Sequence, residues 1–318
     1  MKYSGIGGQA VIEGIMMQNG DDYAIAVRKP NGEIEVKRDR YVSLTEKYPI
    51  LGLPFIRGVF KFADSMVVGM RALTWSCSFF EDDEDAQPGK FEQWLDRVFG
   101  EKLESILMTV VMIFSFIMAI GIFMLLPLGI ARICKPFIPS ETAMAVLEGV
   151  IRIVIFIIYI KLVSRMEDIR RTFMYHGAEH KCINCVEHGH PLTVKYVRES
   201  SKEHKRCGTS FILIVMVISI LMFMVIRVDT IWMRMLSRII LVPVIAGISY
   251  EVLQCAGRSN SKFMDLVSRP GMWMQGLTTK EPDDSMIEVA IAATEAVFDW
   301  REYLTENFPG WEKQLEES

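Results

Sequence analysis

The feature that most constrains this chain is an apolar segment at residues 106–131, which no charged residue interrupts. As an α-helix, this segment is long enough to cross about 30 Å of hydrocarbon. Three further apolar segments lie at residues 143–163, 211–226 and 231–253, and 51% of the chain is hydrophobic. The sequence therefore predicts a mainly α-helical, polytopic membrane protein with about four transmembrane helices. The lipid bilayer is accordingly an expected partner.

Lysine and arginine counts predict the orientation of these spans. Nine of these residues lie between Ser164 and Ser210, whereas the connection between the first two spans holds only Arg132 and Lys135. By the positive-inside rule, the segment 164–210 and both termini face the cytoplasm. In that reducing compartment we expect the six cysteines to be thiols or metal ligands rather than disulfides.

Charge and the N-terminal sequence argue against two other classes. The formal net charge is −4, so the composition predicts no nucleic-acid partner. Residues 1–20 hold a single lysine and no long apolar stretch, and we therefore expect no signal peptide.

The polar parts of the chain predict short elements around the spans. A hairpin is expected because Tyr23–Val27 and Ile34–Val36 flank a turn sequence at residues 30–33, and a short strand is expected at Gln9–Ile12. Residues 53–78 predict an amphipathic helix, which lies on the membrane surface or packs against the spans.

The expected organisation consists of four blocks. Residues 1–52 form a small N-terminal cytoplasmic β module, and residues 53–105 hold an amphipathic helix, an acidic linker (81–85) and a lead-in helix. Residues 106–253 form a four-helix membrane domain that includes the cytoplasmic His/Cys-rich segment 164–210. Residues 254–318 form a cytoplasmic C-terminal region with a loop at 258–279 and a helix at 283–300.

All five histidines lie between His176 and His204, and residues 176–180 have the H-x-x-E-H spacing of the inverted zincin motif. Residues three and four apart share one face of a helix, so both imidazoles could bind one metal ion. Glu179 would then accept a proton from a water that the metal activates. The pattern predicts His176 and His180 as ligands of zinc, or of another divalent transition metal, and Glu179 as a catalytic base.

Three arrangements of this segment remain open. In the first, His176 and His180 bind the metal together with a third ligand such as Glu251, which the fourth span should place at the cytoplasmic face. In the second, a closed structural zinc site of the Cys₃His type forms from Cys182, Cys185, His204 and Cys207. In the third, the histidines are solvated and bind no metal. We favour a site that contains both histidines of the motif, with Glu251, Cys207 and His204 as candidates for the remaining ligands.

The Glu148–Arg152 pair and Glu13 each allow a structural and a functional interpretation. Glu148 and Arg152 are four residues apart within the second span, which favours a mutual ion pair over an ion pathway. Glu13 follows a short apolar strand, and we interpret it as a surface charge rather than a site carboxylate.

Several segments resemble motifs of the YqhQ-like bacterial membrane proteins, a family of unknown function. The resemblance covers roughly residues 5–300 and implies a bacterial inner-membrane location and a metal-dependent enzyme, without a reaction to carry over. Cys182 lies outside the matching motifs, whereas six candidate residues lie within or beside them: His176, Glu179, His180, His204, Cys207 and Glu251. The matching segments are residues 7–17, 56–58, 175–181, 206–211, 250–253, 256–258, 270–275 and 277–282.

The function that these observations predict is a metal-dependent hydrolase at the cytoplasmic membrane face, acting on a peptide or lipid-linked bond. The main alternative is a non-catalytic membrane scaffold or assembly factor with a structural zinc site. A transporter is the third, because a charged pair lies within a span. The substrate and the oligomeric state remain open.

Overall fold

The computed structural model describes residues 2–80, 103–226, 230–258 and 261–316. The chain divides into two compact units: Met1–Phe80, Ile160–Ser219 and Arg227–Ser318 form the first, and Glu81–Tyr159 with Ile220–Ile226 forms the second. The first unit therefore unites both ends of the chain with the whole His/Cys-rich segment 164–210, and its limits differ from those of the four sequence blocks. The acidic linker lies outside the described residues.

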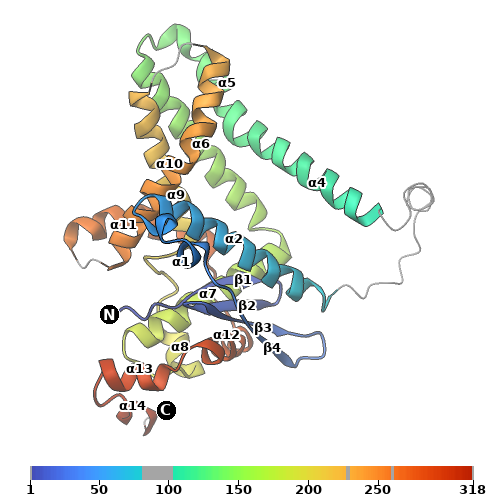
Figure 1. The fold of residues 1–318 in the computed structure, drawn as a ribbon, viewed down its shortest axis with the longest axis vertical. Coiled ribbons are helices and arrows are strands. Elements are labelled where there is room, and N and C mark those ends of the chain that lie inside the picture. Colours follow the sequence, from blue (N-terminus) through green and yellow to red (C-terminus); the bar gives the residue numbers. More distant parts are fainter. Residues whose placement is uncertain (1, 81–102, 227–229, 259–260, 317–318) are drawn as a thin grey trace. The chain divides into compact units, whose positions relative to one another are not determined.

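The first unit contains one sheet and most of the shorter helices (Figure 1). Its strands are β1 (Gly7–Val11), β2 (Gly14–Asn19), β3 (Asp22–Arg28) and β4 (Ile34–Arg40). Its helices are α1 (Leu44–Lys47), the 3₁₀ turn η1 (Pro49–Gly52), α2 (Ile56–Cys77), α7 (Glu167–Glu187), α8 (Val194–Glu199), α10 (Ile231–Arg258), α11 (Lys262–Thr278), α12 (Asp284–Val297), α13 (Trp300–Asn307) and α14 (Lys313–Glu316).

The second unit is built from the first part of the apolar sequence. It contains α4 (Leu103–Ile120), the π-helical turn η3 (Gly121–Leu125), α5 (Leu126–Ile133), the 3₁₀ turn η4 (Lys135–Phe137) and most of α6 (Glu141–Val163). Helix α9 (Gly208–Val225) begins in the first unit and ends in the second.

The sheet is an antiparallel meander in the order β1-β2-β3-β4. The predicted hairpin is confirmed, since β3 and β4 pair from Asp22↔Arg40 to Arg28↔Ile34. Strand β2 was not predicted, because both of its faces are covered and its sequence therefore has no alternation of polar and apolar residues. A tight turn joins it to β1, and Glu13 in this turn has a φ of 47°.

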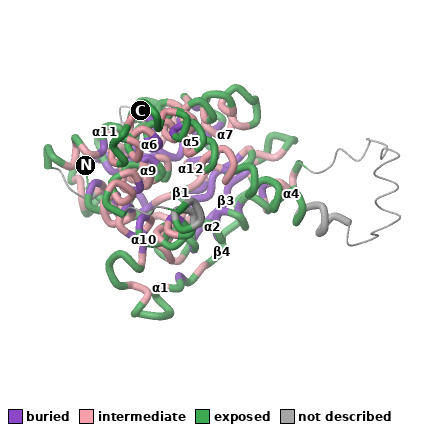
Figure 2. Tube along the Cα trace, turned by 90° about the horizontal axis from the view of Figure 1, so that it is seen from above, coloured by how far each residue is buried: buried purple, intermediate pink, exposed green. Residues whose placement is uncertain are grey.

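Both faces of the sheet are buried at β2 and β3, where alternate residues pack in opposite directions, whereas most of β4 is exposed. Ile15, Met17 and Ala26 join a core with α7 and α12. Met16, Ile25 and Val27 join a second core with Val68 and Ala72 of α2. Figure 1 shows α2 on one side of the sheet with α7 and α12 on the other, and Figure 2 shows buried residues where these elements meet.

Helix α2 confirms the predicted amphipathic helix and packs on both the sheet and α10. A Cβ atom on Gly58 would lie only 2.6 Å from Cβ of Tyr250, and one on Gly247 would lie 2.1 Å from the carbonyl oxygen of Phe55. Small residues therefore let α2 and α10 approach closely. Of the two placements left open by the sequence, the structure shows packing against a predicted span.

Within the part of the chain that the structure describes, four helices are long and apolar enough to cross a membrane: Thr109–Ile133, Glu141–Val163, Gly208–Val225 and Leu236–Gly257. They match the four predicted segments and suggest a membrane protein. Within the second unit, Arg152 donates a hydrogen bond to Glu148 over 3.0 Å, which confirms the predicted ion pair. Arg152 also donates to the carbonyl oxygen of Phe123.

The expectation of a loop at residues 258–279 is wrong, because α11 occupies Lys262–Thr278. Ser261 caps this helix by accepting a hydrogen bond from the backbone N–H of Met264. Gly271 allows close packing of this helix, since a Cβ atom there would lie 2.7 Å from Oγ of Ser210. The predicted C-terminal helix ends at Val297, and Asp299 caps a separate helix, α13.

Candidate metal centre

Helix α7 carries the His-x-x-Glu-His motif and is the central element of the site. Glu167 and Asp168 occupy its first turn, where acidic side chains interact favourably with the helix dipole. The helix ends at Glu187, and Gly189 follows with a φ of 86°, a conformation that commonly ends helices. The second half of α7 is buried between the sheet, α12 and the segment after α8.

Three potential metal ligands come together beside α7. His176, His180 and Cys207 each offer one atom, and these atoms lie within 4.8 Å of one another. Nε2 of His176 lies 3.2 Å from Sγ of Cys207. The two imidazole rings are 4.4 Å apart between centroids, as expected for residues one helical turn apart.

Both imidazole rings are oriented through their second nitrogen. Nδ1 of His176 donates to the carbonyl oxygen of Thr278 over 3.0 Å, and Nδ1 of His180 donates to that of Lys202 over 2.7 Å. Because a carbonyl oxygen only accepts, each Nδ1 carries a proton, and Nε2 is the ring nitrogen left to bind a metal. A backbone carbonyl on the far nitrogen is the usual support of a metal-binding histidine.

The chemistry of the three donors fits a divalent transition metal. Two imidazole nitrogens and one thiolate sulfur form a mixed set that suits zinc. The sulfur of Cys207 also accepts a hydrogen bond from the backbone N–H of Thr209, which helps to fix its position. Structural zinc sites have four protein ligands, whereas catalytic sites have three and keep one position open.

Glu179 lies on the same helix and is only 5% exposed. Burial raises the pKa of Glu179 to about 7, although the nearby His176 and the backbone N–H of Gly8 act in the opposite direction. Strand β1 covers this carboxyl group at Gly8, where a Cβ atom would lie 3.0 Å from Cδ of Glu179. The carboxyl group is therefore held in a water-poor environment, in which its proton affinity is tuned to neutral pH.

The structure places Glu251 away from this cluster. Its carboxylate accepts two hydrogen bonds from Arg57, at 2.7 and 2.6 Å, and one from the backbone N–H of Phe55 at the start of α2. Both oxygen atoms are therefore engaged between α2 and α10. The expectation that Glu251 completes the metal site is not met by this arrangement.

His204 also lies outside the group of three. Its ring is 5.7 Å from that of His180 between centroids, and its Nε2 lies 3.5 Å from Oε2 of Glu187. Burial lowers the pKa of His204 to about 4, so the ring is neutral at physiological pH. His204 therefore neighbours the site, in contact with Glu187.

The Cys₃His arrangement is not assembled either. Cys182 is fully buried in the core between α7 and α12, and burial raises its pKa well above the ordinary value. Cys185 donates to the carbonyl oxygen of Pro191 over 3.3 Å, and burial raises its pKa to about 12. Both thiols are thus protonated core groups.

Two side chains that were not predicted as site residues hold the segment before Cys207: Lys181 from α7 and Gln275 from α11. The buried ammonium of Lys181 donates to the carbonyl oxygens of Arg198 and Ser200 and pairs with Glu281. Gln275 accepts from the backbone N–H of His204 and donates to its carbonyl oxygen. The signal available in the sequence was that Lys181, Gln275 and Glu281 belong to the motifs shared with the family.

The interpretation of Glu13 as a surface charge is wrong. Its carboxylate accepts a hydrogen bond from Arg171 over 2.6 Å and one from the hydroxyl of Tyr175 over 3.2 Å. The turn after β1 is thereby joined to α7, close to the metal-binding motif. Motifs that are distant in the sequence, at residues 7–17, 175–181, 206–211 and 270–282, thus meet around this helix.

The fold and the cluster define a class of protein: four helices of membrane-spanning length, a small antiparallel sheet and a group of two histidines and one cysteine. The model of the family described as "Protein of unknown function (DUF1385)" matches residues 53–300. The chain is 33% identical over 296 residues to "Uncharacterized protein YqhQ" of Bacillus subtilis (strain 168), covering 90% of this chain and 89% of that protein. The chain therefore belongs to the DUF1385 family. No solved structure matches it.

Proposed function

We propose that this protein is a metal-dependent hydrolase of the bacterial inner membrane, with both termini and the metal centre in the cytoplasm. The observation that carries the proposal is the convergence of His176, His180 and Cys207, with both histidines oriented by backbone carbonyls. The four apolar helices and the lysine- and arginine-rich segment 164–210 support the location.

In this proposal, Nε2 of His176, Nε2 of His180 and Sγ of Cys207 would hold the metal. A divalent metal held there would supply a Lewis acid that lowers the pKa of water toward about 7. The carbonyl oxygens of Thr278 and Lys202 hold the two rings in place. Glu179, whose pKa burial raises to about 7, accepts a proton near neutral pH and returns it to the leaving group.

The substrate class is a peptide or lipid-linked bond at the membrane face. Support comes from the fact that α10 carries a candidate span and packs on α2, while α2 also packs on the sheet that covers α7. A site in such a unit can meet substrates that remain in the membrane.

The test is Glu179→Gln, which keeps the size of the side chain but removes its ability to accept the proton. We expect a folded protein that retains its metal but does not complement a deletion strain. Glu167→Gln, an exposed change in the first turn of the same helix, is the matched control and should complement fully. Full complementation by Glu179→Gln would contradict the hydrolase, and loss of metal in this variant would identify Glu179 as a ligand.

A structural metal is the second candidate, and one observation favours it. The cluster joins α7 to the turn before α9, so a metal there would lock two segments together. This scaffold interpretation predicts that Glu179→Gln is functional, whereas loss of a ligand unfolds the segment around residues 198–207.

A further inference from the structure

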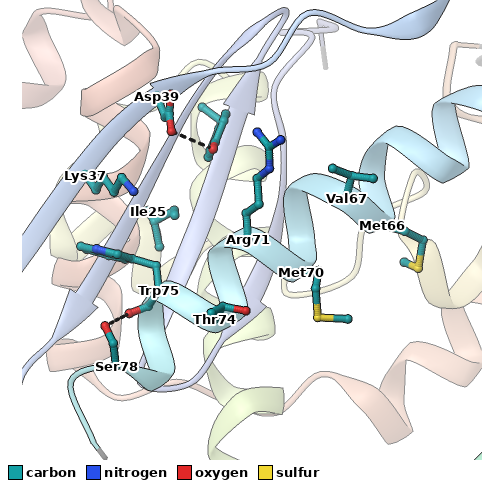
Figure 3. Close-up of a pocket in the computed structure, with 11 residues that line it drawn as sticks. Ile25, Lys37, Asp39, Met66, Val67, Met70, Arg71, Thr74, Trp75 and Ser78 are labelled. Atoms are coloured by element: carbon teal, nitrogen blue, oxygen red, sulfur yellow. Dashed lines mark hydrogen bonds between the residues drawn. The ribbon is translucent and has the colours of Figure 1, made fainter. Parts of the chain in front are cut away.

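A cleft on the face of the sheet opposite α7 is lined by residues of α2, β3 and β4 (Figure 3). It has a volume of about 770 Å³, which lies in the range of sites that bind small molecules. The metal-binding motif is not part of it, so the cleft is separate from the candidate metal centre.

One part of the cleft wall is apolar and open. Met66, Val67 and Met70 of α2 line it and are 51%, 42% and 61% exposed. Phe62 and Leu73 extend this exposed apolar surface along the same helix. Methionine side chains are flexible and adapt to irregular apolar ligands, and acyl chains are ligands of this kind.

The opposite part of the wall carries positive charge. Arg71 reaches from α2 toward the sheet, and Lys37 of β4 lies near Trp75, with its Nζ 5.9 Å from the centre of the indole ring (Figure 3). Asp39 is the acidic residue that lines the cleft, and its carboxylate already accepts from the hydroxyl of Tyr23 and from the backbone N–H of Arg40. Two cations beside one engaged carboxylate favour an anionic group.

We propose that this cleft binds an anionic phospholipid, whose phosphate lies between Arg71 and Lys37 and whose acyl chains begin against Met66, Val67 and Met70. The arginine guanidinium offers two parallel donors to phosphate oxygens, and the lysine adds a second positive charge. The apolar wall continues onto the exposed surface of α2, so a ligand with a charged head and an apolar tail matches both parts of the cleft.

The experiment uses the full-length protein in lipid nanodiscs that contain a photoactivatable phosphatidylglycerol. We expect crosslinks to peptides that include residues 66–75 and β4, and a decrease of at least about fivefold in the double variant Lys37→Gln/Arg71→Gln. Arg71→Lys should retain part of the labelling, because the charge remains while the two parallel donors are lost. The matched control is Arg38→Gln/Lys61→Gln, since Arg38 points to the other face of β4 and Lys61 lies on α2 outside the cleft.

Arg71 also lies over the ring of Tyr41, so its replacement could lower the labelling by disturbing the fold. A second variant that keeps Arg71 tests this alternative. Thr74→Glu adds a carboxylate at an exposed position of the cleft wall, and it should lower the labelling while the melting temperature remains close to wild type. Unchanged labelling in the double variant and in Thr74→Glu would overturn the proposal. Equal labelling by a phosphatidylcholine probe would also overturn it, as would competition by soluble glycerol phosphate at equal concentration.

Discussion

Nε2 of His176 lies 3.2 Å from Sγ of Cys207, although 31 residues separate them in the sequence. One atom belongs to the middle of α7 and the other to the turn that precedes α9. The contact arises because Lys181 and Gln275 fasten the intervening segment at Arg198, Ser200 and His204. The folded chain thereby adds a sulfur ligand to the histidine pair.

The first prediction concerns metal retention. His176→Ala, His180→Ala and Cys207→Ala should each remove most of the bound metal, because two remaining ligands rarely hold a divalent ion. Metal analysis of the purified variants measures the effect. His188→Ala is the matched control, since this exposed histidine follows the same helix and donates to the carbonyl oxygen of Asn184. Equal metal content in all four variants would refute the assignment of ligands.

The second prediction concerns the contact between β1 and Glu179. Gly8→Ala should lower stability by about 1–3 kcal/mol, because the new Cβ atom would lie 2.7 Å from the carbonyl oxygen of Met16 and 3.0 Å from Cδ of Glu179. Gly7→Ala is the control, since no atom lies within 4 Å of a Cβ atom there. Denaturant unfolding measures the difference, and similar midpoints for the two variants would contradict the tight packing.

The third prediction concerns the buried carboxylate of Glu187. Burial alone would raise its pKa, but hydrogen bonds from His204, Arg206 and the backbone of Ser4 outweigh burial and lower the pKa to about 2. Glu187→Gln should therefore cost about 3 kcal/mol at pH 7, because Arg206 loses its buried partner.

The pH dependence of this difference follows from the lowered pKa. A carboxyl group whose pKa is lower in the folded state stabilises the fold above its ordinary value of 4.5, and this contribution is lost as the pH falls from 4.5 toward about 2. The stability gap between wild type and Glu187→Gln should thus narrow in that window. Unfolding curves at pH 7 and pH 3.5 measure it, and a gap that widens in acid would contradict the ion pair.

The fourth prediction concerns orientation in the membrane. In a variant without Cys77, Cys134 and Cys255, Lys195→Cys should stay unlabelled by an impermeant maleimide in intact cells, whereas Pro139→Cys should be labelled. Both positions are exposed in the structure, so accessibility of the side chain itself does not distinguish them. Lysed cells provide the control, in which both positions should react. The reverse pattern in intact cells would refute the cytoplasmic location of residues 164–210.

Local sequence determined the elements whose hydrophobic pattern or turn residues specify their structure without contacts from distant parts of the chain. Residues 106–131 have enough continuous apolar sequence to specify a long helix whatever surrounds them, and the structure has Thr109–Ile133 there. The β3–β4 hairpin followed from its turn residues, and the amphipathic helix from its periodicity. The spacing of His176 and His180 likewise put both rings on one helical face.

Tertiary packing decided which distant groups joined these elements. Glu251 and Cys207 were both candidates beside the histidine motif, yet Arg57 engages the carboxylate of Glu251 while Lys181 and Gln275 bring Cys207 to His176. Strand β2 was not evident because burial on both faces removes the alternation that marks a strand. Contacts between residues far apart in the chain depend on competition among all possible partners, and only the folded structure resolves that competition.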